Sequence, residues 1–194
     1  MGVYLDVPYV PQTGDPTGCW YASACMIGYF FEVGPRMGVP QLYTRSLSPQ
    51  LQQFLGVTAA TGHVATGTAQ SAWLMQGTGM TEHEALARNE HLSPVPHCAH
   101  PTHQYTAKWL ENYLRKHGPV FFYWMKTAGG QTYGHASVMV GVRDNGRMIY
   151  HDPESAANQE MHLNNWEPIR QRWQYALMDR DGVIPFSRGV VTTI

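Results

Sequence analysis

Apolar residues recur at helical spacing in two separate parts of the chain. Residues 19–32 form a dense apolar run that stops at Gly34, which predicts a buried helix with a defined end. Residues 102–117 predict an amphipathic helix that Gly118 would end. The apolar face of this second helix would carry Ala107, Leu110, Tyr113 and Leu114.

The segment between these two helices carries weaker signals. Gly and Thr residues punctuate residues 36–80, which predicts loops around short helices at residues 48–54 and 68–75. Thr81 and Glu84 have the spacing of a capping box, so another helix is expected to begin there.

After residue 118 the hydrophobic pattern changes from that of a helix to that of a strand. Short apolar runs separated by Gly-rich turns predict strands at residues 120–125, 136–142, 148–152 and 174–178, the last strand of the chain. Asn145-Gly146 is a strong hairpin signal. Asn164 and Asn165 are expected to cap a short helix through Arg172. Near the N-terminus, residues 4–10 predict a short extended segment.

The order of the predicted elements indicates an α+β fold. We expect one domain over residues 1–194, with a helical lobe at about residues 12–117 and an antiparallel sheet lobe at about residues 118–194. A cleft between the two lobes would hold the functional site.

Composition supports a folded domain and argues against two classes of partner. The 194 residues are 43% hydrophobic and 14% charged, which is typical of a globular chain. The net charge of −1 gives no basic excess for a nucleic acid or an anionic membrane, so neither partner is expected. No apolar run is long enough to span a bilayer, and no signal-peptide pattern is visible.

The chain has three cysteines, at positions 19, 25 and 98, and a number that is both small and odd does not build a disulfide framework. Cys19 follows Gly18 at the start of the first predicted helix, where free N–H groups favour a thiolate. Cys25 lies in the middle of that helix and is expected to be an ordinary buried side chain. Cys19 is therefore the candidate nucleophile, although a small buried role is the alternative.

Three further residues could complete a site around Cys19. His135 opens an apolar strand, which is a rigid mount for a general base. Asp152 ends the next predicted strand, where a carboxylate could orient the imidazole. Gln12 lies seven residues before Cys19 and could donate a hydrogen bond to an oxyanion. Taken singly, these residues would equally suit a surface His, an Asp-Pro turn and a solvated Gln.

The residues around this set resemble a known family. Val7-Pro8-Tyr9-Val10-Pro11-Gln12 followed by Cys19-Trp20-Tyr21-Ala22, then Gly134-His135-Ala136 and Tyr150-His151-Asp152-Pro153, resemble the motifs of bacterial papain-like cysteine peptidases. The most similar groups are the bacteriocin-leader-processing peptidases and the AvrRpt2-like effectors. The resemblance covers residues 4–33 and 118–178, with a departure at Tyr21, where many members have Ala.

The resemblance implies a papain-like fold and a cofactor-free hydrolysis of peptide bonds. Cys19 would be the nucleophile, His135 the base, Asp152 the orienting residue and Gln12 part of the oxyanion hole. The implied partners are a protein or peptide substrate and an immunity or inhibitor protein that protects the producer. The implied location is a bacterial cytoplasm, or a target cell into which a secretion system delivers the chain.

Three alternatives stay open at this point. The same triad could transfer an acyl group or cleave an amide in peptidoglycan, because the cleft sets the acceptor. A catalytically silent binding module could keep the fold. Residues 91–103 predict a His-rich loop that could bind zinc, although its spacing matches no standard pattern and no metal is expected. The zinc ligands would be drawn from His91, His97, Cys98, His100 and His103.

Overall fold

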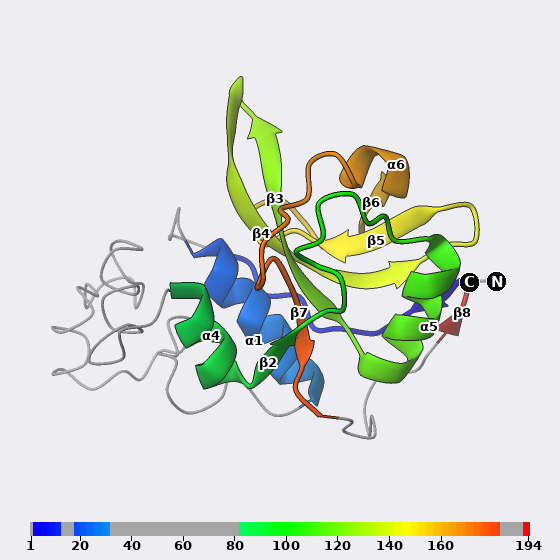
Figure 1. Cartoon of the computed structure of the whole chain (residues 1–194), viewed down its shortest axis with the longest axis horizontal. Helices are drawn as coiled ribbons and strands as arrows, with labels where there is room; N and C mark the ends of the chain where they lie inside the picture. Colours follow the sequence, from blue (N-terminus) through cyan, green and yellow to red (C-terminus); the bar gives the residue numbers. More distant parts are fainter. Residues whose placement is uncertain (1, 13–17, 32–81, 183–191) are drawn as a thin grey trace, which may run out of the picture.

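The computed structural model describes residues 2–12, 18–31, 82–182 and 192–194, which are built around one antiparallel sheet (Figure 1). These residues contain eight strands: six follow the order β2-β7-β3-β4-β1-β8, and off this path β5 pairs with β4 and β6 pairs with β5. The strands are β1 (Val3–Tyr4), β2 (Leu92–Pro94), β3 (Val120–Ala128), β4 (Gln131–Val142), β5 (Arg147–His151), β6 (Gln159–His162), β7 (Leu177–Arg180) and β8 (Thr192–Thr193).

Strands β3 and β4 form a long hairpin that projects beyond the rest of the sheet (Figure 1). Their register runs from Val120 opposite Met139 to Ala128 opposite Gln131. Gly129 and Gly130 make the turn with φ of 58° and 79°, a left-handed conformation that glycine adopts without steric cost. Both strands therefore continue past the predicted segments 120–125 and 136–142.

Strand β4 is the centre of the sheet because it has partners along both edges. β3 pairs with residues 131–139 and β1 with Gly141 and Val142, while β5 pairs along the opposite edge. The backbone of β1 approaches Gly141 so closely that a Cβ there would lie 2.6 Å from the carbonyl oxygen of Val3. Only glycine fits at this position without a shift of β1 or β4.

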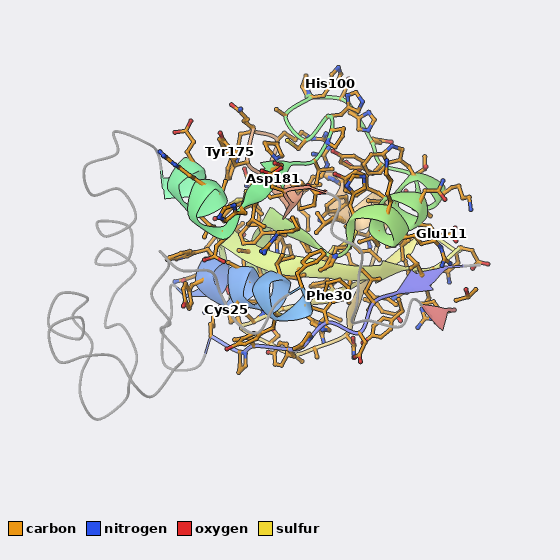
Figure 2. All side chains as sticks on the ribbon, turned by 90° about the horizontal axis from the view of Figure 1, so that it is seen from below. Cys25, Phe30, His100, Glu111, Tyr175 and Asp181 are labelled. Atoms are coloured by element: carbon orange, nitrogen blue, oxygen red, sulfur yellow. The ribbon has the colours of Figure 1, made fainter. Side chains whose placement is uncertain are left out.

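Four helices lie in the described residues, and α1 (Cys19–Phe31) packs against β4. Most of its residues are buried, as expected for a helix that is apolar nearly all round. Figure 2 shows α1, with Cys25 and Phe30, on one side of the long strand β4 and the loop that carries His100 on the other side. None of the described helices has the length and apolarity needed to cross a membrane. The other three are α4 (Glu82–Glu90), α5 (Ala107–His117) and α6 (Leu163–Trp166).

The helix predicted over residues 102–117 begins later, at Ala107. Thr106 is its N-cap, in an extended conformation, and its hydroxyl accepts from the N–H of Trp109 at 3.2 Å. The residue before the cap is held elsewhere, since the N–H of Tyr105 donates to Glu167 Oε1 at 2.6 Å. The helix ends at His117 as predicted, with Gly118 as C-cap.

Three further boundaries differ from the prediction. Ser93 and Pro94, expected in a loop, belong to edge strand β2, where a proline costs no ladder bond. The helix expected to run through Arg172 is the single turn α6, capped by His162, because the chain then forms a bridge between Arg170 and Trp124. The strand expected at residues 174–178 is β7, and β8 follows it.

The mixed helical and antiparallel class is confirmed, and it is compatible with a papain-like fold. The order "helices first, then sheet" is not followed throughout, because β1 and β2 precede residue 118 and still belong to the sheet. The single domain and its two lobes stay predictions. The short helices predicted at 48–54 and 68–75 and the capping residue Thr81 lie outside the described residues, whereas α4 follows Thr81 as expected.

Candidate active site

Cys19 is the first residue of α1. The helix starts here because Gly18 supplies the carbonyl that accepts from the N–H of Ala22 at 2.9 Å. The thiol is partly exposed, whereas Cys25 and Cys98 are buried at 3% and 4% exposure. Burial raises the pKa of the Cys25 thiol far above its usual range. Of the three free thiols, Cys19 is thus the one at a helix N-terminus and open to solvent.

His135 lies on β4 and links Cys19 to Asp152. Its Nε2 donates to Asp152 Oδ1 at 2.7 Å, and its ring is also hydrogen-bonded to the side chain of Cys19. Because Nε2 is committed to the carboxylate, Nδ1 is the nitrogen that faces the thiol. The ring is only 2% exposed, with Trp124 and Tyr133 edge-to-face at 5.9 and 6.2 Å between centroids.

The electrostatics of this pair favour a charged imidazole and a charged carboxylate. Burial opposes the charged ring, but hydrogen bonds to Asp152 and Cys19 outweigh it and raise the pKa of His135 to about 9. Burial would likewise raise the pKa of Asp152, but hydrogen bonds from His135 and Lys126 hold it well below its usual range. At neutral pH the site therefore contains an imidazolium between two acceptors.

A buried lysine occupies the other side of the carboxylate. Lys126 Nζ lies 2.6 Å from Asp152 Oδ2, 2.6 Å from Glu154 Oε2 and 3.0 Å from Ser155 Oγ. The hydroxyl of Tyr133 donates to both oxygens of Glu154, at 2.9 and 2.7 Å. These bonds overcome burial and hold the pKa of Glu154 below its usual range, so the loop after β5 carries two ionised carboxylates around one ammonium.

The N-terminal segment is fastened to the same loop. The hydroxyl of Tyr9 donates to the carbonyl of Asp152 at 3.0 Å, and the N–H of Gln12 donates to the carbonyl of Pro153 at 2.9 Å. Gln12, which is half-buried, is thereby placed next to the loop that carries Asp152. The structure brings Cys19, His135 and Asp152 together directly, and joins Gln12 to them through its backbone.

Within the described part of the chain, His135, Asp152 and Glu154 form one group whose potential ligand atoms lie within 4.8 Å of one another. The group does not suit a metal ion. Lys126 Nζ already lies 2.6 Å from both carboxylates, and a second cation would have to displace it.

The His-rich loop forms no comparable group. The rings of His97 and His103 are 4.6 Å apart, but the nitrogens of the loop do not converge as ligands would. His100 Nδ1 accepts from the N–H groups of Thr102 and His103, which is a loop-fixing role. Two guanidinium groups also lie at this loop, because Arg170 and Arg172 both donate to the carbonyl of His103, at 2.7 and 2.8 Å.

Sequence reasoning missed Lys126, Tyr133 and Glu154. The only signal for Lys126 is its place at the end of an apolar strand, where a lysine usually lies at the surface. Its burial depends on the full length of the hairpin, which sets Lys126 opposite Tyr133. The correct hairpin length would have placed both residues on the same face as His135.

Comparison with known families gives one match that covers most of the chain. The sequence model of a family described as papain-like cysteine protease AvrRpt2 matches residues 2–171. The match includes Cys19, His135 and Asp152 as well as the loop that holds Lys126.

Proposed function

Because the chain belongs to the AvrRpt2 family of papain-like cysteine proteases, and is thus a hydrolase that acts on proteins, we propose that Cys19, His135 and Asp152 are its catalytic triad. One observation carries this proposal: His135 is hydrogen-bonded to Asp152 on one side and, on the other, to Cys19, which lies at the N-terminus of α1. The order of the three residues along the chain is that of the motifs that carry the resemblance.

The proposed reaction begins with the Cys19 thiolate, which attacks the carbonyl carbon of the scissile peptide bond. The negative charge moves to the carbonyl oxygen, where the N–H of Cys19 and the side chain of Gln12 would donate hydrogen bonds. His135 gives its Nδ1 proton to the leaving amine, and a thioester to Cys19 remains. His135 then takes a proton from water as the water oxygen attacks the thioester, and the intermediate collapses to release the acid and the Cys19 thiolate, which restores the thiolate–imidazolium pair.

Asp152 would act throughout as the orienting group. Its carboxylate fixes the ring of His135 through Nε2, so that Nδ1 stays directed at Cys19. It also stabilises the imidazolium while the thiolate is the reactive species. We place the substrate in a cleft between the α1 side and the sheet side, with hydrolysis rather than acyl transfer as the outcome.

The proposal is tested by limiting iodoacetamide across pH, with labelling read by intact mass. Cys19 is expected to label alone and fast below pH 7, and to slow in His135→Ala. Cys19→Ala is the negative control. Equal labelling of wild type and His135→Ala at every pH would contradict the pair. Peptides newly formed from a whole-cell protein extract, compared with Cys19→Ala, then identify the substrate bond.

For the biological setting, we propose that the chain is an effector that acts inside a target cell, and that an immunity or inhibitor protein protects its producer. The support is the family match, together with the resemblance of the sequence motifs to those of AvrRpt2-like effectors. Expression in a bacterial cytoplasm should slow growth for wild type and leave growth normal for Cys19→Ala. Identical growth of the two strains would remove the idea of a cytoplasmic toxin.

A further inference from the structure

One face of the β3–β4 hairpin carries four side chains of the site in a two-by-two arrangement. In the register, Trp124 lies opposite His135 and Lys126 lies opposite Tyr133. Directly paired residues, and residues two apart on a strand, share a face of the sheet. Lys126 is therefore presented to the site by the same rigid element that presents His135.

Every N–H donor of the Lys126 ammonium has an acceptor. It has three N–H donors, and three acceptors surround it: Asp152 Oδ2, Glu154 Oε2 and Ser155 Oγ. The residue is 7% exposed, and a buried ammonium is tolerated only when such partners satisfy it. All three partners belong to the loop after β5, so this lysine ties the hairpin to that loop.

The two oxygens of Asp152 have separate tasks. Oδ1 accepts from His135 Nε2 at 2.7 Å and from the N–H of Glu154 at 3.0 Å. Oδ2 accepts from Lys126 at 2.6 Å. With both oxygens held, the carboxylate cannot rotate about its last bond, and Oδ1 stays directed at the imidazole.

We propose that Lys126 is a positioning residue of the triad, which holds Asp152 ionised and oriented so that His135 keeps its proton and its direction toward Cys19. This inference rests on the proposed function of the triad. It assigns to the hairpin a part in the chemistry beyond carrying His135. Lys126 acts through Asp152 and touches neither the substrate nor the thiol.

The charge of Lys126 matters because the other groups around Asp152 do not replace it. Without Lys126, burial and the carboxylate of Glu154 would both favour a protonated Asp152, and the hydrogen bonds from His135 and from the N–H of Glu154 would oppose them. A protonated carboxyl stabilises the imidazolium less and weakens the pairing with the thiolate. The titratable groups that face Asp152 from the surrounding elements are Tyr9, Cys19 through His135, Lys126, His135, Tyr150 and Glu154.

The test is the pH profile of Cys19 alkylation by iodoacetamide. In Lys126→Met the acid limb of the profile is expected to move to higher pH, because an Asp152 that loses its ammonium partner protonates more readily and stabilises the imidazolium less. At a pH on that limb, labelling should fall about tenfold for each unit of the shift. Lys108→Met is the matched control, since Lys108 is exposed on α5 and forms its ion pair with Glu111 of the same helix. Its profile should coincide with that of wild type.

A second variant separates a chemical role from a loss of fold. Lys126→Met with Glu154→Gln removes one charge of each sign, so the local charge balance is kept while Asp152 still lacks its partner. A shifted limb in this folded double variant supports the proposal. A wild-type limb in either folded variant overturns it, provided that wild-type Cys19 is reactive. An unreactive wild-type Cys19 would instead overturn the triad itself, and with it the role of Lys126.

Discussion

The imidazole of His151 donates from Nε2 to the carbonyl oxygen of Val7, 2.8 Å away, and so ties the N-terminal segment to the end of β5. Its other nitrogen, Nδ1, accepts from the N–H of Asn158 at 3.1 Å. Both positions are satisfied only by a neutral ring, and burial lowers the pKa of His151. The histidine next to Asp152 is thus neutral, while His135 is charged.

Replacing His151 with Phe keeps a ring of similar shape and removes both hydrogen bonds. The carbonyl of Val7 and the N–H of Asn158 would lose their partners, at a cost of about 1–3 kcal/mol in the free energy of unfolding at pH 7.5. Because the folded-state pKa of His151 is lowered, the unfolded chain binds more protons below about pH 6.5, and wild type loses stability as the pH falls. Urea denaturation should therefore show a smaller gap between wild type and variant at pH 5 than at pH 7.5. A gap of constant size would mean that the ring titrates alike in both states.

The opposite sign is expected for His135. Its folded pKa is about 9, so its contribution to stability is complete below about pH 6.5 and is lost as the pH rises through about 9. Imidazole NMR signals of wild type should show a titration midpoint near 9 for His135. In Cys19→Ala the midpoint should fall, because the hydrogen bond and charge of the thiolate are gone. His135→Asn, in which the signal disappears, provides the assignment, and an unchanged midpoint in Cys19→Ala would argue against the thiolate–imidazolium pair.

Much of the candidate site could be proposed from the sequence, because its residues lie beside strong local signals. Cys19 follows a turn and opens an apolar run, and His135 and Asp152 lie at or near strand ends that the period-2 pattern marks. These are local patterns, and a local pattern can be recognised from one sequence without knowledge of the tertiary contacts. The structure then places His135 against both of the others.

What the sequence could not supply depends on pairing between distant segments. Strand β1 has two residues, and it is a strand only because Gly141 allows a close approach on β4. Lys126 is buried only because an acidic loop some thirty residues later folds over it. Neither fact follows from secondary-structure propensity or from hydrophobic periodicity, since both depend on contacts between segments that are far apart in the sequence.

The opposed hydrogen bonds of Asp152 predict an unusual response to Asp152→Asn. An amide has one acceptor oxygen and one donor NH₂, so if the oxygen faces His135, the NH₂ faces the ammonium of Lys126. We expect a loss of Cys19 labelling of about tenfold or more below pH 7. Adding Lys126→Met removes the clash of donors, so the double variant should label faster than Asp152→Asn alone. Labelling in the double variant equal to the product of the two single losses would show that the residues act independently.

The final prediction concerns Gly141, where β1 meets β4. A Cβ added at Gly141 would lie 2.6 Å from the carbonyl oxygen of Val3 and 3.3 Å from the Cα of Tyr4, both backbone atoms that cannot move without shifting a strand. Gly141→Ala is expected to lower the free energy of unfolding by about 1–3 kcal/mol through this overpacking. Gly134→Ala is the matched control on the same strand, because a Cβ there meets nothing within 4 Å. Urea denaturation of the two variants should separate them clearly. Equal stabilities would mean that β1 yields at little cost, and that the tie between the N-terminal segment and the active site depends on Tyr9 and His151 rather than on β1.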